Sequence, residues 1–136
     1  MDLRQAFIKH LEIRDISYDD KDNLLLFSYE GWRFALMYDE AEPYYFRLAI
    51  PRVASINQST DSALLRNALS LSRDYKVAKA VISQDEIWLF FETFLFDYDF
   101  KNTKLFDKAI LILAHFANDL HQKIPQKTNS ETSSST

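Results

Sequence analysis

The most apolar stretch of the chain, 79–96, reads KAVISQDEIWLFFETFLF and predicts a β-hairpin of strands 77–82 and 87–96. Side chains alternate between the two faces of a strand, so the second strand divides into two sets. One set contains Ile87, Leu89, Phe91 and Leu95, and the other contains Trp88, Phe90, Phe94 and Phe96 with Glu92 among them. Because both sets are apolar, this strand needs a cover on each face. We expect the first set to pack against the helices of the domain.

Three further strands precede this hairpin. The runs 24–29 (LLLFSY), 32–38 (WRFALMY) and 44–50 (YYFRLAI) are rich in strand-forming residues and are separated by short loops. Gly31 permits a positive φ in the tight turn between the first two runs. Pro51 is expected to end the third run, because proline cannot donate to a strand ladder. Short connections between consecutive strands predict an antiparallel meander.

Apolar residues at helical spacing predict three helices: one through about residue 13, one over 61–74, and one from Asn102 or Thr103 to about residue 123. Asp2 and Gln5 form a capping-box pattern at the start of the first helix. The inner faces of the second and third helices contain Leu64, Leu65, Ala68, Leu69, Leu71 and Tyr75, and Phe106, Ala109, Ile110, Leu113, Ala117, Leu120 and Ile124, respectively.

These elements predict an α+β fold in the order α-β-β-β-α-β-β-α, with an antiparallel five-stranded sheet and helices packed on one face. Residues 15–23 (DISYDDKDN) are polar, and we expect a solvated, turn-rich loop there. Residues 1–124 are predicted to form one domain, and the polar tail 125–136 is predicted to be disordered. A sheet covered by helices on one face leaves its other face to water or to a partner.

Composition excludes several classes of function. The 136 residues include one glycine, which argues against a phosphate-binding loop, and no cysteine, which removes disulfides and thiolate metal sites. The net charge of −4, without a block of Lys or Arg, makes nucleic acid an unexpected partner. The charged N-terminus does not resemble a signal peptide, and no run has the ~20 apolar residues that span a bilayer. We therefore expect a cytoplasmic protein with no membrane partner.

Candidate catalytic or metal-binding groups are weakly patterned. His115 and Asp119 are four residues apart on the third helix, but His121 lies about 240° from His115 around the helix axis. The 97–102 loop (DYDFKN) starts like a calcium loop and then places Lys101 and Asn102 where the pattern needs a ligand and a glycine. We expect no catalytic residues, no metal and no cofactor, and hence no enzyme.

Several short strings resemble one known architecture. They are Ile56-Asn57, 75–79 (YKVAK) and 92–95 (ETFL), with the helix 105–120 behind them. In this element order the chain resembles the type III secretion chaperone-like fold and, within it, the YbjN-like bacterial proteins. The resemblance implies a small, often dimeric, non-enzymatic protein. Secretion chaperones bind extended segments of effector proteins, whereas YbjN-like proteins mostly lack a defined activity.

The surplus apolar face of the last strand carries the functional hypothesis. Each large aromatic side chain buries ~150–250 Å², so exposure of several would cost much of a domain's stability. The face of Trp88, Phe90, Phe94 and Phe96 is either covered by the chain's own first helix or loops, or is a dimer interface, or is a partner-binding groove. Glu92, if buried there, needs a cation, for which Arg33, Arg47 and Lys79 are candidates.

Two classes of function follow. The first is a non-enzymatic protein-interaction module, chaperone-like or regulatory, that forms a homodimer and binds a segment of an unknown protein partner. The alternative is a small-ligand or lipid-binding domain with a cavity between sheet and helices, which would need an apolar pocket of several hundred Å³. An enzyme that uses His115 and nearby acids is the third and least supported hypothesis.

Overall fold

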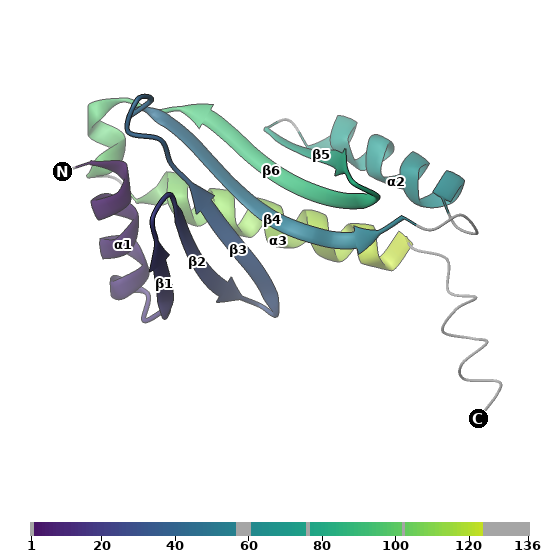
Figure 1. Cartoon of the computed structure of the whole chain (residues 1–136), viewed down its shortest axis with the longest axis horizontal. Coiled ribbons are helices and arrows are strands. Elements are labelled where there is room, and N and C mark those ends of the chain that lie inside the picture. Colours follow the sequence, from purple (N-terminus) through teal and green to yellow (C-terminus); the bar gives the residue numbers. More distant parts are fainter. Residues whose placement is uncertain (1, 57–60, 76, 102, 124–136) are drawn as a thin grey trace.

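The computed structural model describes residues 2–56, 61–75, 77–101 and 103–123, in which three α-helices pack against an antiparallel sheet (Figure 1). The α-helices are α1 (Leu3–Ile13), α2 (Asp61–Asp74) and α3 (Lys104–Lys123), with a short 3₁₀ helix, η1 (Asp97–Phe100), before α3. The strands are β1 (Tyr18–Lys21), β2 (Leu24–Tyr29), β3 (Trp32–Met37), β4 (Tyr45–Ser55), β5 (Ala78–Ser83) and β6 (Glu86–Phe94). The α+β class is confirmed.

The sheet has six strands in the order β1-β2-β3-β4-β6-β5, and each neighbouring pair is antiparallel. The long strands β4 and β6 are adjacent, and α3 runs behind them in the view of Figure 1. The helix α2 lies along the edge strand β5 and also contacts α3, while α1 lies at the β1 end. The three α-helices of the described residues therefore lie on one side of the sheet, and none of them lies on the opposite side.

The prediction of five strands was wrong because β1 lies within the segment expected to be a solvated loop. Residues 18–21 (YDDK) pair with β2 from Tyr18↔Phe27 to Lys21↔Leu24. A short strand whose side chains are largely charged and exposed is typical of a sheet edge, where charge discourages pairing with another chain. A charged, exposed edge strand therefore has the same kind of composition as a solvated loop, and the sequence pattern does not distinguish the two.

The prediction that the third meander strand ends before Pro51 was also wrong. The strand β4 continues to Ser55, and its register with β6 shifts between Ile50 and Ala54. Arg52, within this irregularity, has a φ of 52°. A bulge removes the local requirement for a ladder hydrogen bond, so proline is accommodated there without ending the strand.

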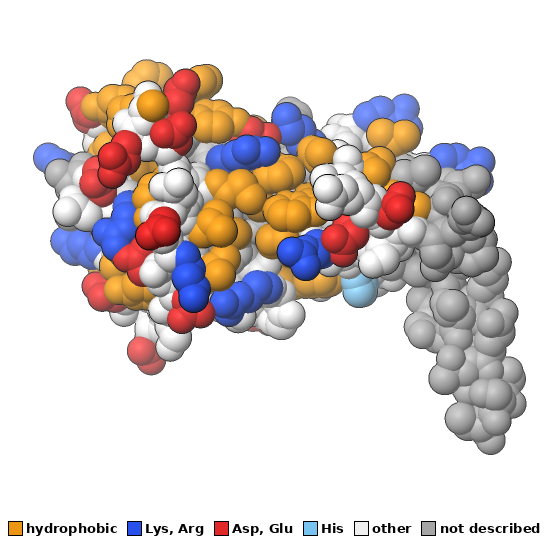
Figure 2. All heavy atoms as spheres, viewed as in Figure 1, with side chains coloured by type: hydrophobic (Ala, Val, Ile, Leu, Met, Phe, Trp, Pro, Cys, Tyr) orange, Lys and Arg blue, Asp and Glu red, His pale blue; other side chains and the backbone are white. Residues whose placement is uncertain are grey.

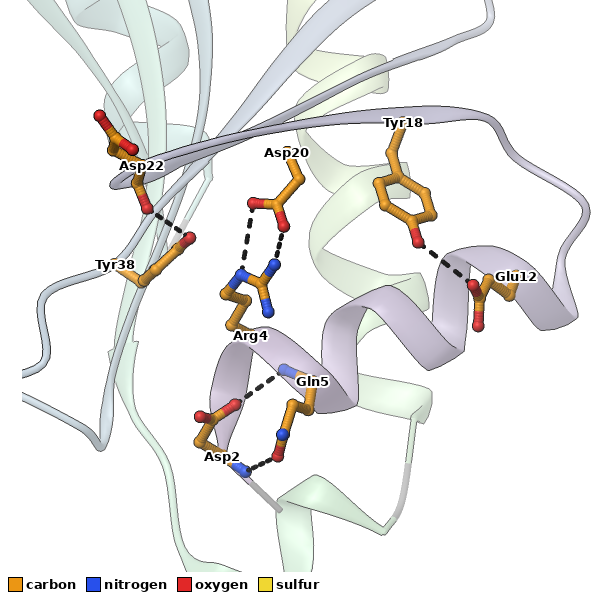
Figure 3. Close-up of polar contacts among 8 residues, drawn as sticks. All are labelled: Asp2, Arg4, Gln5, Glu12, Tyr18, Asp20, Asp22 and Tyr38. Carbon is orange, nitrogen blue, oxygen red and sulfur yellow. Dashed lines mark hydrogen bonds and ion pairs between the residues drawn. The ribbon is translucent and has the colours of Figure 1, made fainter.

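The first helix is fixed at its start and along its outer side. The predicted capping box is confirmed: the Asp2 carboxylate accepts from the Gln5 backbone N–H, and the Gln5 side chain accepts from the Asp2 N–H. Arg4 pairs with Asp20 of β1, and the Tyr18 hydroxyl donates to Glu12 at 3.1 Å (Figure 3). These contacts attach α1 to the edge strand.

The core lies between the sheet and the helices. Phe7 of α1 packs with its ring centroid 5.6 Å from Phe27, 6.0 Å from Phe46 and 4.9 Å from Phe106 of α3. The expectation for the last strand is confirmed, since Ile87, Leu89, Phe91 and Leu95 are all buried. Leu69, which was predicted on the inner face of the second helix, is exposed, so that prediction was wrong. The side chains of Leu64 and Leu65 and the whole of Ile124 lie outside the described residues, as does the tail 125–136.

A candidate protein-binding surface on the open sheet face

The helix-free face of the sheet presents the second set of β6 side chains. The register places Trp88 beside Val81 of β5, and Phe94 beside Tyr45 of β4. Between them, Phe90 lies next to Ala49, and Glu92 next to Arg47. Figure 2, which views this face, shows hydrophobic side chains gathered across its middle with charged side chains around them. The first helix packs on the other side of the sheet and does not cover this face.

Phe90 is covered by its own chain. The guanidinium carbon of Arg47 lies 4.4 Å from the centroid of the Phe90 ring, and the Trp88 ring stacks beside it at 6.1 Å. Only 5% of Phe90 is exposed, whereas Trp88 is half-buried. Phe90 therefore shapes the face and holds its neighbours in place, and it offers almost no area to a partner.

Glu92 sits between two cations on this face. Its carboxylate lies 3.3 Å from the Lys79 Nζ and 3.7 Å from the Arg47 Nε. Two of the three cations expected from the sequence are confirmed, while Arg33 pairs with Asp19 of β1 at 3.1 Å. The charges in the middle of the face are thus largely paired within the chain.

The exposed apolar area lies at the far end of β6. Phe94 is 67% exposed and Phe96, just beyond the end of the strand, is 65% exposed. The Phe94 ring contacts Tyr45 with a centroid distance of 5.3 Å. A large aromatic side chain that is two-thirds exposed forgoes about 3 kcal/mol of burial free energy. Of the four face residues expected from the sequence, these two have the most area left for a partner.

A groove adjoins Phe94. One pocket of about 350 Å³ is lined by Met37, Tyr38, Asp39, Glu42, Tyr45, Arg47 and Phe94. A second pocket of about 290 Å³ is lined by Asp2, Leu3, Arg4, Tyr38, Asp39, Glu40, Glu42 and Pro43. The two pockets share three lining residues, so they adjoin, and together they form what we call the Phe94 groove. The sequence predicts residues 39–43 (DEAEP) only as a short loop between two strands and gives no indication of their place in this groove.

The loop that walls the groove is held by hydrogen bonds. The Asp39 side chain accepts from the Ala41 N–H at 2.9 Å, and the Asp39 carbonyl accepts from the Glu42 N–H at 2.9 Å. The Tyr38 hydroxyl donates to the carbonyl of Asp22 at 2.6 Å (Figure 3). These contacts fix the loop against the β1–β2 turn, so the wall of the groove is preformed.

Tyr44, on the far side of the same loop, joins it to the segment after β6. Its ring stacks on Phe100 of η1 at 5.8 Å, and its hydroxyl donates to the Asp97 carboxylate. That hydrogen bond to a carboxylate is the main reason why the pKa of Tyr44 is raised. The ends of β4 and β6 are therefore linked beside the groove.

The histidines and acids of α3 do not converge. His115 is exposed, Asp119 accepts a hydrogen bond from the Tyr75 hydroxyl, and the His121 Nε2 lies 3.1 Å from the carbonyl of Val53. Within the described ranges, no three His, Asp or Glu side chains are grouped so that they could hold a metal ion. Each of these side chains has a separate structural environment.

His10, for which the sequence shows no local partner, is buried between α1 and α3. Only 1% of it is exposed, and its Nε2 lies 3.0 Å from Asp107 of α3. Burial lowers the pKa of His10, and the Asp107 carboxylate acts in the opposite direction. Arg14 pairs with the same carboxylate. A partner 97 positions away in the chain cannot be recognised from local spacing.

The fold and surface define a small α+β protein with helices on one sheet face and an aromatic, groove-bearing opposite face. The chain has a YbjN-like fold. It is similar to the crystal structure of YbjN from E. coli, for which a role as a transcription regulator has been suggested, with a TM-score of 0.54 and 11% sequence identity over 85% of this chain and 92% of that chain. No family model and no curated protein matches the sequence. None of the helices in the described part of the chain is long and apolar enough to cross a membrane.

Proposed function

We propose that this chain is a non-enzymatic protein-interaction module, chaperone-like or regulatory, that forms a homodimer and binds a segment of a protein partner on its open sheet face. The exposure of Phe94 and Phe96 at the end of β6, next to a preformed groove, carries this proposal. Exposed aromatic side chains that cluster on a face are typical of protein interfaces. The suggested role of YbjN as a transcription regulator supports a regulatory function within this proposal. We also propose that the chain is located in the cytoplasm.

The groove suits a protein segment better than a nucleic acid. Several cations on the open face are paired with a carboxylate, as in Lys79 with Glu92 and Arg33 with Asp19. Paired cations release few counterions on binding phosphates, so the electrostatic term that dominates nucleic-acid affinity is small. Apolar contact is the larger attraction that this face can offer.

The ligand-binding alternative has weaker support. It requires a cavity between sheet and helices, and the aromatic rings of Phe7, Phe46 and Phe106 fill that space with centroid distances of 4.9 to 6.0 Å. A pocket on that side lies at the margin of α1 and α3, beside the ion pair of Arg14 and Asp107. This packing favours binding on the outer face over binding in the interior.

The homodimer and the bound segment occupy different halves of the open face. Trp88 and Phe94 are six residues apart on β6, which is ~20 Å along a strand. We assign the half around Trp88 and Val81 to a second copy of the chain. Side chains of both signs, Arg52 with Glu86 and Lys79 with Glu92, flank that half. A patch with both charges can meet its own copy across a twofold axis without net repulsion.

Light scattering on the eluting protein tests the homodimer. We expect the wild-type chain to be dimeric at submillimolar concentration and the Trp88→Glu variant to be monomeric. Leu111→Glu is the matched control, because Leu111 is an exposed apolar residue on the helix side of the molecule. A wild-type chain that stays monomeric, or a Trp88→Glu variant that stays dimeric, contradicts this arrangement.

Binding of labelled peptides tests the segment. An extended peptide with alternating leucines should bind to the wild-type chain and lose most of its affinity for Phe94→Glu, while Leu111→Glu binds like the wild type. Equal binding to all three chains would place the peptide elsewhere and contradict the proposed site.

A further inference from the structure

We infer that the Phe94 groove selects segments in which Lys or Arg flanks apolar side chains. This inference rests on the proposed function, since it names the chemistry of the segment that the interaction module binds. It follows from three properties of the groove: carboxylates without a cation, an apolar floor, and a wall that is ordered before binding.

The rim of the groove carries unneutralised negative charge. Asp39, Glu40 and Glu42 are exposed, and none of them forms an ion pair with any residue that the structure describes. Two cations line the groove, but both are engaged elsewhere. Arg4 pairs with Asp20, and Arg47 lies against Glu92 and the ring of Phe90. Three carboxylates within four consecutive positions therefore face the solvent at the mouth of the groove.

The floor of the groove fits an apolar side chain. Met37 and Tyr45 are half-buried on the open face, and the Phe94 ring beside them is two-thirds exposed. A pocket of about 350 Å³ has room for a leucine or phenylalanine side chain of the partner. The exposed faces of the two aromatic rings are also favourable positions for a Lys or Arg, because a cation is attracted to the centre of such a ring.

The carboxylates at the rim and the apolar floor of the groove can contact the same segment because the loop that forms the wall is ordered before binding. The hydrogen bonds of Asp39 with Ala41 and Glu42 hold the Asp39 carboxylate and the backbone of the loop in place without a partner. Little conformational entropy is then lost in the loop on binding. Exposed ion pairs are individually weak, so we expect two or three of them to change affinity by about tenfold in total. The effect should shrink as salt is added, since these charges lie at the surface.

Three fluorescein-labelled peptides test the inference. They share the same alternating leucines and carry Lys, Gln or Glu at the intervening positions, and their binding is followed by fluorescence anisotropy at low and physiological salt. For the wild-type chain we expect the Lys peptide to bind about tenfold more tightly than the Gln peptide, and the Glu peptide to bind most weakly. The double variant Asp39→Lys/Glu42→Lys should reverse this order.

The matched control makes the same change of net charge at a distance. Glu30 and Asp85 lie in the turns at the opposite ends of β3 and β6 from the groove, and both are exposed with positive φ. The Glu30→Lys/Asp85→Lys variant should keep the wild-type order of the three peptides. A reversal in this control as well would show that net charge alone sets the preference, and would overturn the inference.

Two further outcomes overturn it. If the three peptides bind equally well to the wild-type chain, or the Glu peptide binds best, the selection for basic segments fails while the proposed segment binding stands. If none of the three peptides binds, both the inference and the proposed segment binding fail, and the light-scattering measurement still decides the homodimer independently.

Discussion

The guanidinium of Arg47 covers the ring of Phe90 on the open face of the sheet, with its central carbon 4.4 Å from the ring centroid. The same side chain lies 3.7 Å from the Glu92 carboxylate through its Nε. One residue therefore covers an aromatic ring that would otherwise meet solvent and helps to neutralise the acid between the strands. This explains why only part of the predicted aromatic face is available to a partner.

Removing that cover should lower stability. We expect Arg47→Ala to reduce the free energy of unfolding by about 1 kcal/mol, because the Arg47 side chain is partly exposed and its contacts are screened by solvent. Arg47→Met keeps an unbranched apolar stem over the ring and should recover most of that loss. Urea denaturation measures both. An Arg47→Met variant as unstable as Arg47→Ala would mean that charge, and not cover, is the main contribution.

Phe94 should behave as a surface residue and not as a core residue. We expect Phe94→Gln to change the free energy of unfolding by less than about 0.5 kcal/mol, because two-thirds of the side chain is already exposed. Phe46→Ala, at a fully buried position, should cost about 3–5 kcal/mol. Both are measured by urea denaturation. A large loss for Phe94→Gln would show that Phe94 is retained for folding and would weaken its assignment to binding.

His10 should make stability depend on pH. Its pKa is lowered below the ordinary 6.5 mainly by burial, so the unfolded chain takes up a proton at a higher pH than the folded chain does. The unfolded state then binds more protons as pH falls below 6.5, and the free energy of unfolding decreases in that range. Well above 6.5 both states are neutral at this position and the effect disappears.

Urea denaturation between pH about 7.5 and about 5.5 measures this dependence. His10→Gln should flatten the decrease, because glutamine does not titrate. His115→Gln, which removes an exposed histidine of α3, is the matched control. Equal slopes for the wild-type chain and His10→Gln would exclude His10 as the source.

The turn between β2 and β3 should depend on its glycine. Gly31 has a φ of +82°, and apart from the glycine and its two chain neighbours no residue has a heavy atom within 4 Å of the position that a Cβ would take. Gly31→Ala therefore meets no clash and isolates the cost of the left-handed backbone, which we expect to be about 1 kcal/mol. Gly31→Asn should cost less, because asparagine tolerates this conformation. If thermal or urea unfolding shows that Gly31→Asn is less stable than Gly31→Ala, this explanation is contradicted.

The sequence predicts the buried half of this fold well. Period-2 alternation in β6 assigns Ile87, Leu89 and Phe91 to the helix side, and burial confirms each assignment. The strands and helices that have a strong apolar pattern lie within a few residues of their predicted bounds. These elements are predictable because hydrophobic periodicity reports directly on which side of an element is buried.

The remaining parts of the fold, and the groove, have no hydrophobic periodicity in the sequence that would predict them. The strand β1 is charged, and β4 passes through Pro51 by means of a bulge, so composition indicates a loop in one case and a strand end in the other. The cover of Phe90 depends on the register of β4 against β6, and the groove depends on how the loop 39–43 lies beside Phe94. Both are long-range relationships that spacing along the chain does not contain.

The most direct test of the central claim, that the open sheet face is a protein-interaction surface, is hydroxyl-radical footprinting of the wild-type chain at low and high concentration. Trp88 and Val81 should be labelled less at high concentration, while Leu69 and Leu111, which are exposed on α2 and α3, keep their labelling and serve as internal references. Unchanged labelling of Trp88 and Val81 together with a new protection of Leu69 or Leu111 would contradict the account.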